Sequence, residues 1–499
     1  MSFTWRSIRT RLARARLLLD AYDQQVVIDH LAHDSRRVGP NGLFVAMRGE
    51  KTDGHLFIDK AVQNEASAVV CEVIPAGARE RFPGVAFAQV SQARTALAEL
   101  AAAWYSDPAR ELTITGITGT NGKSTTAHLL HALLTALGAK TGLLGTIEYR
   151  CGADPEPAAL TTPDALQLQG MLRRMANAGC SYCVMEVSSH ALAQARTHGV
   201  PFAAAIFTNL SRDHLGYHAT KSAYAAAKKR LFDDLPTEAM AIYNADDPAG
   251  KQMVSSTAAH TLSYGQSAEA NIRVEILEDD LHGLRLRLDG IAEKFRLAGH
   301  FNAYNLAAAY AAARSLGFAS RPVVDVLAQV EAPPGRFEKH AFADGTLVIV
   351  DYAHTPDALG NVLQTIRASK PHQSALWCLF GCGGDRDRSK RPLMGAVAER
   401  LADHIIITSD NTRTEAQERI NEDIRAGMQH PARANWITDR RSAIRAVAHR
   451  ASPGDIVLVA GKGHEQVQTI GTRSVPFDDR QEVRRAFRLR GLPTAKKPI

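Results

Sequence analysis

One stretch of this chain decides its fold: Thr115-Gly-Ile-Thr-Gly-Thr-Asn-Gly-Lys-Ser-Thr-Thr126. It follows an apolar run of strand length and precedes an Ala/Leu-rich segment with helical spacing. Its glycines let backbone N–H groups turn toward an anion, the first turn of the helix adds its dipole, and Lys123 supplies a cation. The sequence therefore predicts a strand, a phosphate-binding loop and a helix in immediate succession.

The loop is a variant of the common phosphate loop. The strict pattern has a glycine five residues before Gly122, and Ile117 stands there, flanked by Gly116 and Gly119. A glycine-rich turn that binds no nucleotide is the alternative, but the Lys-Ser pair and the preceding strand favour ATP. We predict that ATP contacts seven consecutive residues and that the serine among them also meets Mg²⁺. These residues are Gly119, Thr120, Asn121, Gly122, Lys123, Ser124 and Thr125.

The alternation of strand and helix continues outward from this loop. Segments with helical spacing, such as 125–137 and 305–316, separate apolar runs of strand length. Polar or glycine-rich residues follow nearly every run, as at the carboxyl ends of parallel strands, where such sheets bind ligands. The runs lie at residues 112–115, 182–186, 204–208, 239–243, 347–350, 375–380, 404–408 and 456–459.

We predict an α/β protein of three domains. Asp107-Pro108 and Pro333-Pro-Gly335 are natural breaks between them. Residues 1–107 form a smaller N-terminal α/β domain, and residues 108–335 form a central P-loop-type domain, whose mostly parallel sheet has helices on both faces. Residues 336–499 form a C-terminal Rossmann-like α/β domain.

Composition excludes several classes of protein. The 499 residues are 45% hydrophobic and 22% charged, and no apolar run is long enough to span a bilayer, so we expect no membrane insertion. The formal charge of +7 comes from scattered basic residues interleaved with acids, which suits anionic small molecules and does not indicate nucleic acid. Cys180 and Cys183 form a lone CxxC with no second pair at metal-site spacing, so we interpret the six cysteines as reduced thiols of a cytoplasmic protein in preference to a zinc site or a redox pair.

Several motifs in a fixed order extend this reading: Met185-Glu-Val-Ser-Ser-His190, Asn209-Leu-Ser-Arg-Asp-His214, Gly299-His-Phe-Asn-Ala-Tyr-Asn305, Pro334-Gly-Arg336 and Asp351-Tyr-Ala-His-Thr-Pro356. Together with the phosphate loop, they resemble the Mur ligases over essentially the whole chain. The resemblance implies an ATP-dependent amide ligase of peptidoglycan precursor synthesis, and so of cell-wall formation, cell shape and cell division. ATP converts a carboxylate to an acyl phosphate, and an amine then attacks it.

The resemblance also implies a catalytic set of four residues: Lys123, Glu186, His214 and Lys228. Glu186 and His214 match the family's ligands for Mg²⁺, with Ser124 on the nucleotide side. Lys228 matches the lysine that the family carbamylates with carbon dioxide. The neighbouring lysine at position 229 is the competing assignment, and a solvated helix face is the alternative for both.

The two nucleotide-containing substrates are assigned by the same resemblance. Asn305 meets the adenine, Asp351 the ribose and Arg336 the phosphates of ATP. Taken without the family, Asn305 could simply cap a helix. The UDP-linked muramoyl dipeptide is assigned to Ser35, Thr161, Thr162, Ser188, Gln194 and Arg196.

The incoming amino acid is read from Asp410-Asn-Thr-Arg413, which resembles the Asp-Asn-Pro-Arg motif of members that add meso-diaminopimelate. A planar guanidinium offers two parallel hydrogen bonds to the second carboxylate of that molecule. Thr412 replaces the proline of the motif and leaves the identity of the amino acid open. The predicted contacts are Arg391, Asp410, Asn411, Arg413, Gly461 and Glu465.

Three alternatives accompany this interpretation. The same chemistry could use L-lysine or another amino acid. A folylpolyglutamate-type ligase shares the loop, but the N-terminal segment and the residues 410–413 argue against it. A binding module without catalysis would have lost the four catalytic residues, and all are present. We expect a monomer whose partners are small molecules only.

Overall fold

The computed structural model describes residues 3–22, 26–49 and 52–491, and these pack into two units. Unit 1 comprises residues 1–116, 139–205 and 234–239, and unit 2 comprises residues 117–138, 206–233 and 240–499. None of the helices in the described part of the chain has the length and apolar character that crossing a bilayer requires.

Unit 1 begins with a five-stranded sheet in the order β2-β7-β6-β5-β4. The strands β4 to β7 are parallel and β2 is antiparallel to β7. Successive side chains of β5 point to opposite faces of this sheet. Leu43 and Val45 pack in the hydrophobic core formed with α1 and α4, whereas Phe44 packs in the core formed with α2. The elements are β1 (Phe3–Thr4), α1 (Trp5–Arg14), β2 (Leu18–Tyr22), β3 (Val27–Ile28), β4 (His30–Ala32), β5 (Gly42–Val45), α2 (Ile58–Gln63), β6 (Ala66–Cys71), α3 (Ala78–Arg81), β7 (Ala86–Val90) and α4 (Ala93–Trp104).

The central sheet has the strand order β11-β10-β9-β12-β8-β13-β14-β15-β16-β17-β18. Strands β8 and β13 lie in its middle, and each contributes residues to both units. The strands are β8 (Thr113–Thr118), β9 (Thr141–Leu144), β10 (Glu148–Cys151), β11 (Asp154–Pro157), β12 (Tyr182–Glu186), β13 (Phe202–Phe207), β14 (Met240–Asn244), β15 (His260–Gly265), β16 (Ile272–Asp280), β17 (Gly283–Leu288) and β18 (Ile291–Phe295).

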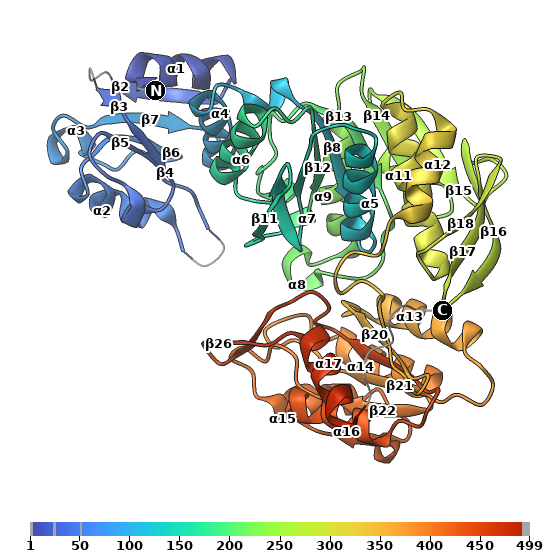
Figure 1. The fold of residues 1–499 in the computed structure, drawn as a ribbon. Helices are drawn as coiled ribbons and strands as arrows, with labels where there is room; N and C mark the ends of the chain where they lie inside the picture. Colours follow the sequence, from blue (N-terminus) through green and yellow to red (C-terminus); the bar gives the residue numbers. More distant parts are fainter. Residues whose placement is uncertain (1–2, 23–25, 50–51, 492–499) are drawn as a thin grey trace. The chain divides into compact units, whose positions relative to one another are not determined.

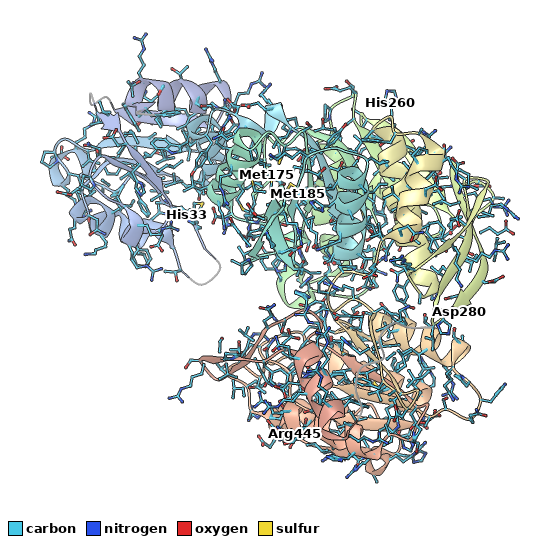
Figure 2. The ribbon with its side chains drawn as sticks, viewed as in Figure 1. His33, Met175, Met185, His260, Asp280 and Arg445 are labelled. Carbon is cyan, nitrogen blue, oxygen red and sulfur yellow. The ribbon has the colours of Figure 1, made fainter. Side chains whose placement is uncertain are left out.

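The helices of this part pack on the sheet within each unit. In unit 1, Met175 of α6 covers Gly142 of β9, where a side chain would collide with the thioether, and Figure 2 labels Met175 with the equally buried Met185 of β12. In unit 2, α11 packs against α5, β14 and β15. The helices are α5 (Lys123–Ala136), α6 (Ala165–Asn177), α7 (Ser189–Ala193), α8 (Leu215–His218), α9 (Lys221–Asp233), α10 (Gly250–Met253), α11 (His300–Ser315) and α12 (Ser320–Gln329).

The rest of unit 2 is a six-stranded sheet in the order β19-β20-β24-β21-β22-β23. All neighbours are parallel except β19 and β20. The elements are β19 (Glu338–Ala341), β20 (Leu347–Asp351), α13 (Pro356–Ser369), β21 (Leu376–Phe380), α14 (Lys390–Leu401), β22 (His404–Ile407), α15 (Gln417–Arg425), β23 (Ala434–Trp436), α16 (Arg440–Arg450), β24 (Ile456–Ala460), the hairpin β25 (Val467–Ile470) and β26 (Arg473–Pro476), and α17 (Asp479–Leu489).

Both faces of this sheet are covered, as its apolar strands require. Ile456 and Leu458 of β24 enter the core with α13, α14 and α15, whereas Val457 and Val459 enter the core with α16 and α17. Figure 1 shows these two sets of helices around the strands drawn in orange and red. The doubly wound arrangement brings the carboxyl ends of β20, β24, β21 and β22 to one edge.

The α/β fold with helices on both faces of largely parallel sheets is confirmed. Each of the eight apolar runs named above became a strand, and both helical segments became helices. Two antiparallel extensions of the central sheet, β10–β11 and β16–β17–β18, were not predicted. In β17 buried leucines alternate with exposed arginines, so a search for period two could have found it. The domain boundaries at residues 107 and 335 stay predictions.

Candidate active site

The loop between β8 and α5 is built around two glycines. Gly119 and Gly122 have φ of 149° and 86°, values that L side chains rarely adopt. A Cβ at Gly119 would collide with Thr208 Oγ1, and one at Gly122 with Asn305 Oδ1. Asn121 donates its N–H to Asn209 Oδ1 at 3.0 Å, so the loop is also tied to the residues after β13. The predicted ATP residues therefore form one close-packed turn at the amino end of α5.

Lys123 folds back over this loop. Its Nζ donates to Gly119 O at 2.9 Å and to Thr120 O at 2.8 Å, which holds the ammonium above the turn. The hydroxyl of Ser124, a buried residue, accepts a hydrogen bond from Arg336 Nη2 at 3.0 Å. The structure thus brings together two residues that are 212 positions apart in the sequence.

Arg336 carries a donor suited to an anion. Its guanidinium lies 4.5 Å from the ring centroid of Tyr352, which fixes the plane of the group. Its Nε is buried and has no hydrogen-bond partner in the described part of the chain. Because a buried unpaired donor is costly, this atom fits a phosphate oxygen bound at the loop.

Lys228 reaches the same loop from α9. It is 1% exposed, and its Nζ donates to Gly119 O at 2.7 Å and lies 4.4 Å from the ring centroid of Tyr224. Burial, with repulsion from Lys123, holds the pKa of Lys228 well below its ordinary value. The competing Lys229 instead pairs with Asp233 and Ser256. The geometry therefore favours Lys228 over Lys229 as the lysine that acts at the phosphate loop.

His214 stands beside a group of charges that the sequence analysis did not single out. Its Nε2 lies 3.3 Å from Asp213 Oδ2, and His354 Nε2 lies 4.0 Å from the same oxygen. Burial opposes the charge of Asp213, but attraction by His214, His354 and Lys390 outweighs it and lowers the pKa of Asp213 to about 2. Burial, with repulsion from Lys390, lowers the pKa of His354 to about 4. Asp213 lies in the motif that ends at His214, and His354 lies in the motif that begins at Asp351. Their place in these motifs is the feature of the sequence that could have identified them.

Two further predicted ATP residues are held by the protein itself. Asn305 lies inside α11, accepts from Thr126 Oγ1 at 3.3 Å and donates to Asn302 Oδ1, so it does not cap the helix. Asp351, at the end of β20, accepts at 2.7 Å from the N–H groups of Phe337 and Ala353. Burial raises the pKa of Asp351.

In unit 1, Glu186 ends β12 and is fully buried. Its two carboxylate oxygens accept from the N–H and hydroxyl of Thr146, at 2.7 Å and 2.9 Å. A Cβ at Gly145 would lie 2.7 Å from Glu186 Oε1, so the chain needs glycine beside this carboxylate. Thr146 and Gly145 fix the Glu186 side chain and were missed, since nothing in a Gly-Thr pair alone indicates such a role.

Predicted substrate residues of unit 1 form one hydrogen-bonded cluster with Glu186. Thr162 donates to Glu186 O at 2.8 Å and accepts from the N–H of Ser188. Arg196 donates from Nη1 to Thr162 O at 2.8 Å and from Nη2 to Gln194 Oε1 at 2.7 Å. Thr161 joins through Thr146 Oγ1 at 3.0 Å. Ser35 follows β4 in the five-stranded sheet, where its carbonyl accepts from Asn64 Nδ2.

The residues predicted to bind the incoming amino acid lie where β22 and β24 end. Gly461 has φ of 112°, and a Cβ there would lie 2.7 Å from Asp410 Oδ2. Asn411 Nδ2 donates to Glu465 Oε2 at 2.8 Å. Arg413 donates from Nη1 to Gly384 O at 2.8 Å, and burial and Arg386 lower its pKa against the attraction of Asp410 and Glu465.

Arg391 is held differently from the other predicted amino-acid residues. It is fully buried, with Nη2 2.6 Å from Glu415 Oε2 and Nη1 2.8 Å from Asp423 Oδ2. It also donates to Gly383 O, next to which Arg413 packs. A direct contact between Arg391 and a ligand stays a prediction, because these bonds use both of its Nη atoms within the protein.

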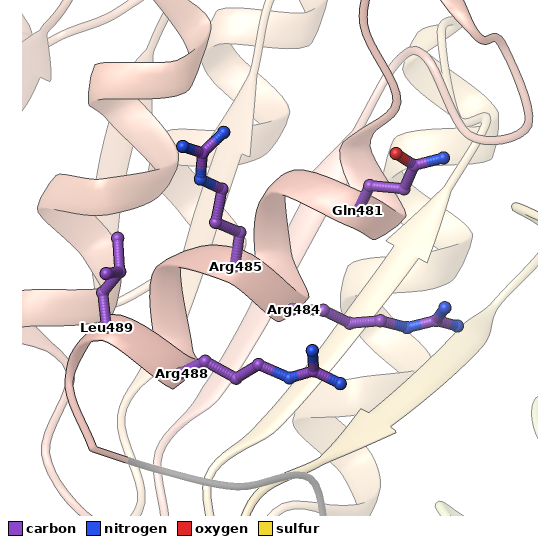
Figure 3. Close-up of a pocket in the computed structure, with 5 residues that line it drawn as sticks. All are labelled: Gln481, Arg484, Arg485, Arg488 and Leu489. Atoms are coloured by element: carbon purple, nitrogen blue, oxygen red, sulfur yellow. The ribbon is translucent and has the colours of Figure 1, made fainter.

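A hollow of about 420 Å³ lies elsewhere, on α17. Its lining consists of Gln481, Arg484, Arg485, Arg488 and Leu489, whose side chains Figure 3 shows along the helix. None of the predicted site residues lines it. It is therefore not part of the candidate site at the strand ends.

Three segments match family models, described as Mur ligase family catalytic domain (residues 27–105), Mur ligase middle domain (117–313) and Mur ligase glutamate ligase domain (335–463). Two relatives are identical to this chain at about two fifths of the aligned positions, over nine tenths of its length. The chain belongs to the Mur ligase family.

This Mur ligase is similar to two curated UDP-N-acetylmuramoyl-L-alanyl-D-glutamate–2,6-diaminopimelate ligases. That of Cytophaga hutchinsonii is 43% identical, over 91% of this chain and 93% of the relative. That of Parabacteroides distasonis is 44% identical, over 93% and 95%. A solved structure described by the same enzyme name is 34% identical, with a TM-score of 0.66 over 98% of this chain and 100% of the other.

Proposed function

We propose that this Mur ligase uses ATP to join meso-diaminopimelate to UDP-N-acetylmuramoyl-L-alanyl-D-glutamate, a step of peptidoglycan precursor synthesis. One observation carries the proposal: the chain matches UDP-N-acetylmuramoyl-L-alanyl-D-glutamate–2,6-diaminopimelate ligases along more than nine tenths of its length. The phosphate loop with Lys123, Lys228 and Arg336 supplies fixed hydrogen-bond donors and positive charge, which phosphoryl transfer needs to stabilise its developing negative charge. The strand ends with Asp410, Arg413 and Glu465 offer both signs of charge to a diamino acid.

The reaction follows in two balanced steps. A substrate carboxylate oxygen attacks the terminal phosphorus of ATP, the bond to the bridging oxygen breaks, and ADP leaves. The neutral amine then attacks the acyl carbon, phosphate leaves with the bonding electrons, and the nitrogen loses a proton. Lys123 and the Arg336 Nε donor neutralise the phosphate charge that would otherwise repel the attacking carboxylate.

The residue types present in each unit suit Mg²⁺. In unit 2, Ser124 offers a hydroxyl and His214 an imidazole, and in unit 1 Glu186 offers a carboxylate whose orientation Thr146 fixes. Among the described residues no three His, Cys, Asp or Glu side chains form a ready-made metal cluster. Water and substrate phosphate would therefore complete the coordination, as Mg²⁺ commonly requires, and the ion would supply further charge neutralisation.

Carbamylation of Lys228 is part of the proposal. The reaction needs a neutral amine, because nitrogen's lone pair forms the bond to carbon dioxide. Burial of Lys228 beside Lys123 lowers the pKa of its amine, which favours the neutral form. The product is an anion that balances the surrounding cations.

The muramoyl dipeptide is assigned to unit 1. Thr161, Thr162, Ser188, Gln194 and Arg196 are already ordered by mutual hydrogen bonds, so little side-chain entropy remains to be lost on binding. The uridine part falls to Ser35 and its neighbours. A cytoplasmic location and a monomeric state remain expectations from the sequence.

An amine panel tests the proposal. Phosphate release is measured with ATP, magnesium and the UDP-linked dipeptide, while meso-diaminopimelate, L-lysine and other amino acids are offered in turn. We expect product with diaminopimelate and much less with L-lysine. Turnover with L-lysine alone would show that the substitution at Thr412 accompanies another substrate.

Arg413→Ala sharpens this test. The change removes the guanidinium proposed to hold the second carboxylate, so the KM for diaminopimelate should rise about 10-fold to 100-fold. The KM for ATP should hardly change, because the phosphate loop is untouched. Equal effects on both constants would contradict the assignment.

A further inference from the structure

A buried lysine joins the residues that are predicted to bind the incoming amino acid at the strand ends. This lysine, Lys462, was not among the residues predicted from the sequence. Lys462 is fully buried. Its Nζ donates to Val467 O at 2.7 Å, to Glu465 Oε2 at 2.8 Å and to Asn411 Oδ1 at 3.2 Å. An ammonium has three N–H donors, and here all three have acceptors. Lys462 therefore acts on other residues of the protein and has no donor left for a ligand.

These bonds decide which way the Asn411 amide faces. Its Oδ1 receives both Lys462 Nζ and the N–H of Thr469, at 3.2 Å and 2.9 Å. Two donors require the oxygen at this end, so the Nδ2 group must face Glu465 Oε2. A side chain in the motif thus takes its orientation from Lys462.

The same bonds orient the Glu465 carboxylate. Its Oε2 is occupied by Lys462 and Asn411, both at 2.8 Å. Its Oε1 makes no hydrogen bond to any of the residues that the structure describes, and the side chain is 25% exposed. Glu465 therefore presents Oε1 as the acceptor for an incoming ammonium.

Lys462 also balances the charge of this group. Asp410 and Glu465 are carboxylates, and both act on Arg413, whose pKa they raise against burial and Arg386. Lys462 and Arg413 match these two carboxylates charge for charge, and Arg386 acts on the group as a further cation. A group that presents both carboxylates and cations matches the end of a diamino acid that carries an ammonium and a carboxylate on one carbon.

We infer that Lys462 is a positioning residue that selects an amino acid with a second carboxylate over one that ends in a plain ammonium. The inference rests on the proposed function. Without Lys462 the group would lose one positive charge beside its two carboxylates, so it would attract the ammonium of lysine more strongly and the second carboxylate less strongly. The attraction of Arg413 for the second carboxylate would then be opposed by repulsion from Glu465, which would have lost its ion pair with Lys462.

The test compares amine selectivity in wild type and Lys462→Met. We expect the KM for diaminopimelate to rise about 10-fold and the ratio of kcat/KM for diaminopimelate to that for L-lysine to fall about 10-fold. The KM for ATP should stay within about twofold. Lys339→Met is the matched control, because Lys339 donates to the carbonyl of Leu281, away from these strand ends. That variant should keep the wild-type ratio.

Two more variants separate charge from position. Lys462→Met with Glu465→Gln removes one cation and one carboxylate, which restores the net charge of the group and should recover part of the lost selectivity. Lys462→Arg keeps the charge in a planar group of different shape, so it should raise the KM for diaminopimelate and largely keep the ratio. A folded Lys462→Met with the wild-type ratio would overturn the inference.

Failure to fold would not remove the test. If Lys462→Met is unfolded by circular dichroism, Glu465→Gln alone leaves excess positive charge and should depress L-lysine use more than diaminopimelate use. Equal losses would overturn the inference. A wild type that makes product only with another amine would instead overturn the proposed substrate, and an inactive wild type would remove both.

Discussion

At the scale of the residue, the candidate site depends on side chains whose surroundings alter their chemistry. Lys228 has no carboxylate among its hydrogen-bond partners and lies against an aromatic ring and a loop carbonyl. Asp213 keeps its charge under burial because two histidines and Lys390 surround it. The neighbouring Lys229, with an ion pair at the helix surface, is an ordinary lysine by comparison. Burial and neighbours, not residue type, separate these roles.

Lys228→Ala should lower kcat by more than about 100-fold, because the group that organises charge at the loop is lost. Lys229→Ala is the matched control and should keep most activity. Incubation with ¹³C-labelled carbon dioxide should give a carbamate NMR signal in wild type and in the Lys229 variant, and none in the Lys228 variant. Ordinary turnover by Lys228→Ala would exclude the role.

His354 predicts a pH dependence of stability. Its folded pKa of about 4 lies below the ordinary 6.5, so the unfolded chain binds more protons between these values. Stability is therefore fully present above pH 6.5 and is lost as the pH falls toward 4. The side chain is 35% exposed, so screening reduces the effect to about 1 kcal/mol.

His354→Gln should flatten the pH profile of the unfolding free energy in this window, measured by urea denaturation. His372→Gln, at an exposed loop position, should leave the profile unchanged. An unchanged slope in the His354 variant would contradict the assigned cause.

At the scale of the element, the loop before α5 is shaped by what packs against it. β8 delivers the chain to Gly119, whose α hydrogens lie against Thr208 at the end of β13. α11 brings Asn305 against Gly122 from another side. The N–H groups at the start of α5 are thereby held in place before nucleotide arrives, which reduces the entropy lost on binding.

Gly119→Ala should weaken ATP binding by at least about 10-fold and destabilise the protein by about 2 kcal/mol, because the added Cβ collides with Thr208 and the φ of 149° is strained. Calorimetry of ATP binding measures the first effect and thermal unfolding the second. Gly39→Ala is the control, since its Cβ would meet nothing within 4 Å. Wild-type affinity in the Gly119 variant would show that the loop relaxes freely.

At the scale of the whole molecule, the strand ends are held by an ion pair distant from them in the sequence. Arg440 at the start of α16 and Asp479 at the start of α17 are both fully buried, with Nη2 and Oδ2 2.7 Å apart. Arg440 also donates to Ala460 O at 2.9 Å and to Ser409 O at 3.4 Å. These carbonyls directly precede Gly461 and Asp410, so the same ion pair supports both the stability of the fold and the proposed amino-acid site.

Asp479→Asn should cost about 3 kcal/mol, because it leaves Arg440 buried without a counter-charge. The KM for diaminopimelate should rise with it, since the chain before Asp410 and Gly461 loses its anchor. Urea unfolding and steady-state kinetics measure the two effects. Glu482→Gln, which breaks the more exposed pair with Arg441, should cost at most about 1 kcal/mol. Similar costs for the two variants would contradict the explanation.

The sequence by itself determined the elements and the order of the motifs. Strand and helix runs are local patterns of apolar residues, and the phosphate loop is a local pattern of glycines before a lysine, so both can be read without contacts. The α/β class and the eight named strands followed from them. The antiparallel strands after Gly265 were missed because the apolar runs used as the strand signal are continuous, whereas β17 alternates buried leucines with exposed arginines.

Only the tertiary structure decided which side chains meet. The choice between Lys228 and Lys229, the contact of Arg336 with Ser124, and the pairing of Glu186 with Thr146 depend on contacts between residues distant in sequence. The same is true of the bond between Lys462 and Asn411, which are 51 positions apart in the sequence. Burial and hydrogen-bond saturation are properties of packed neighbours, and a linear pattern does not contain them.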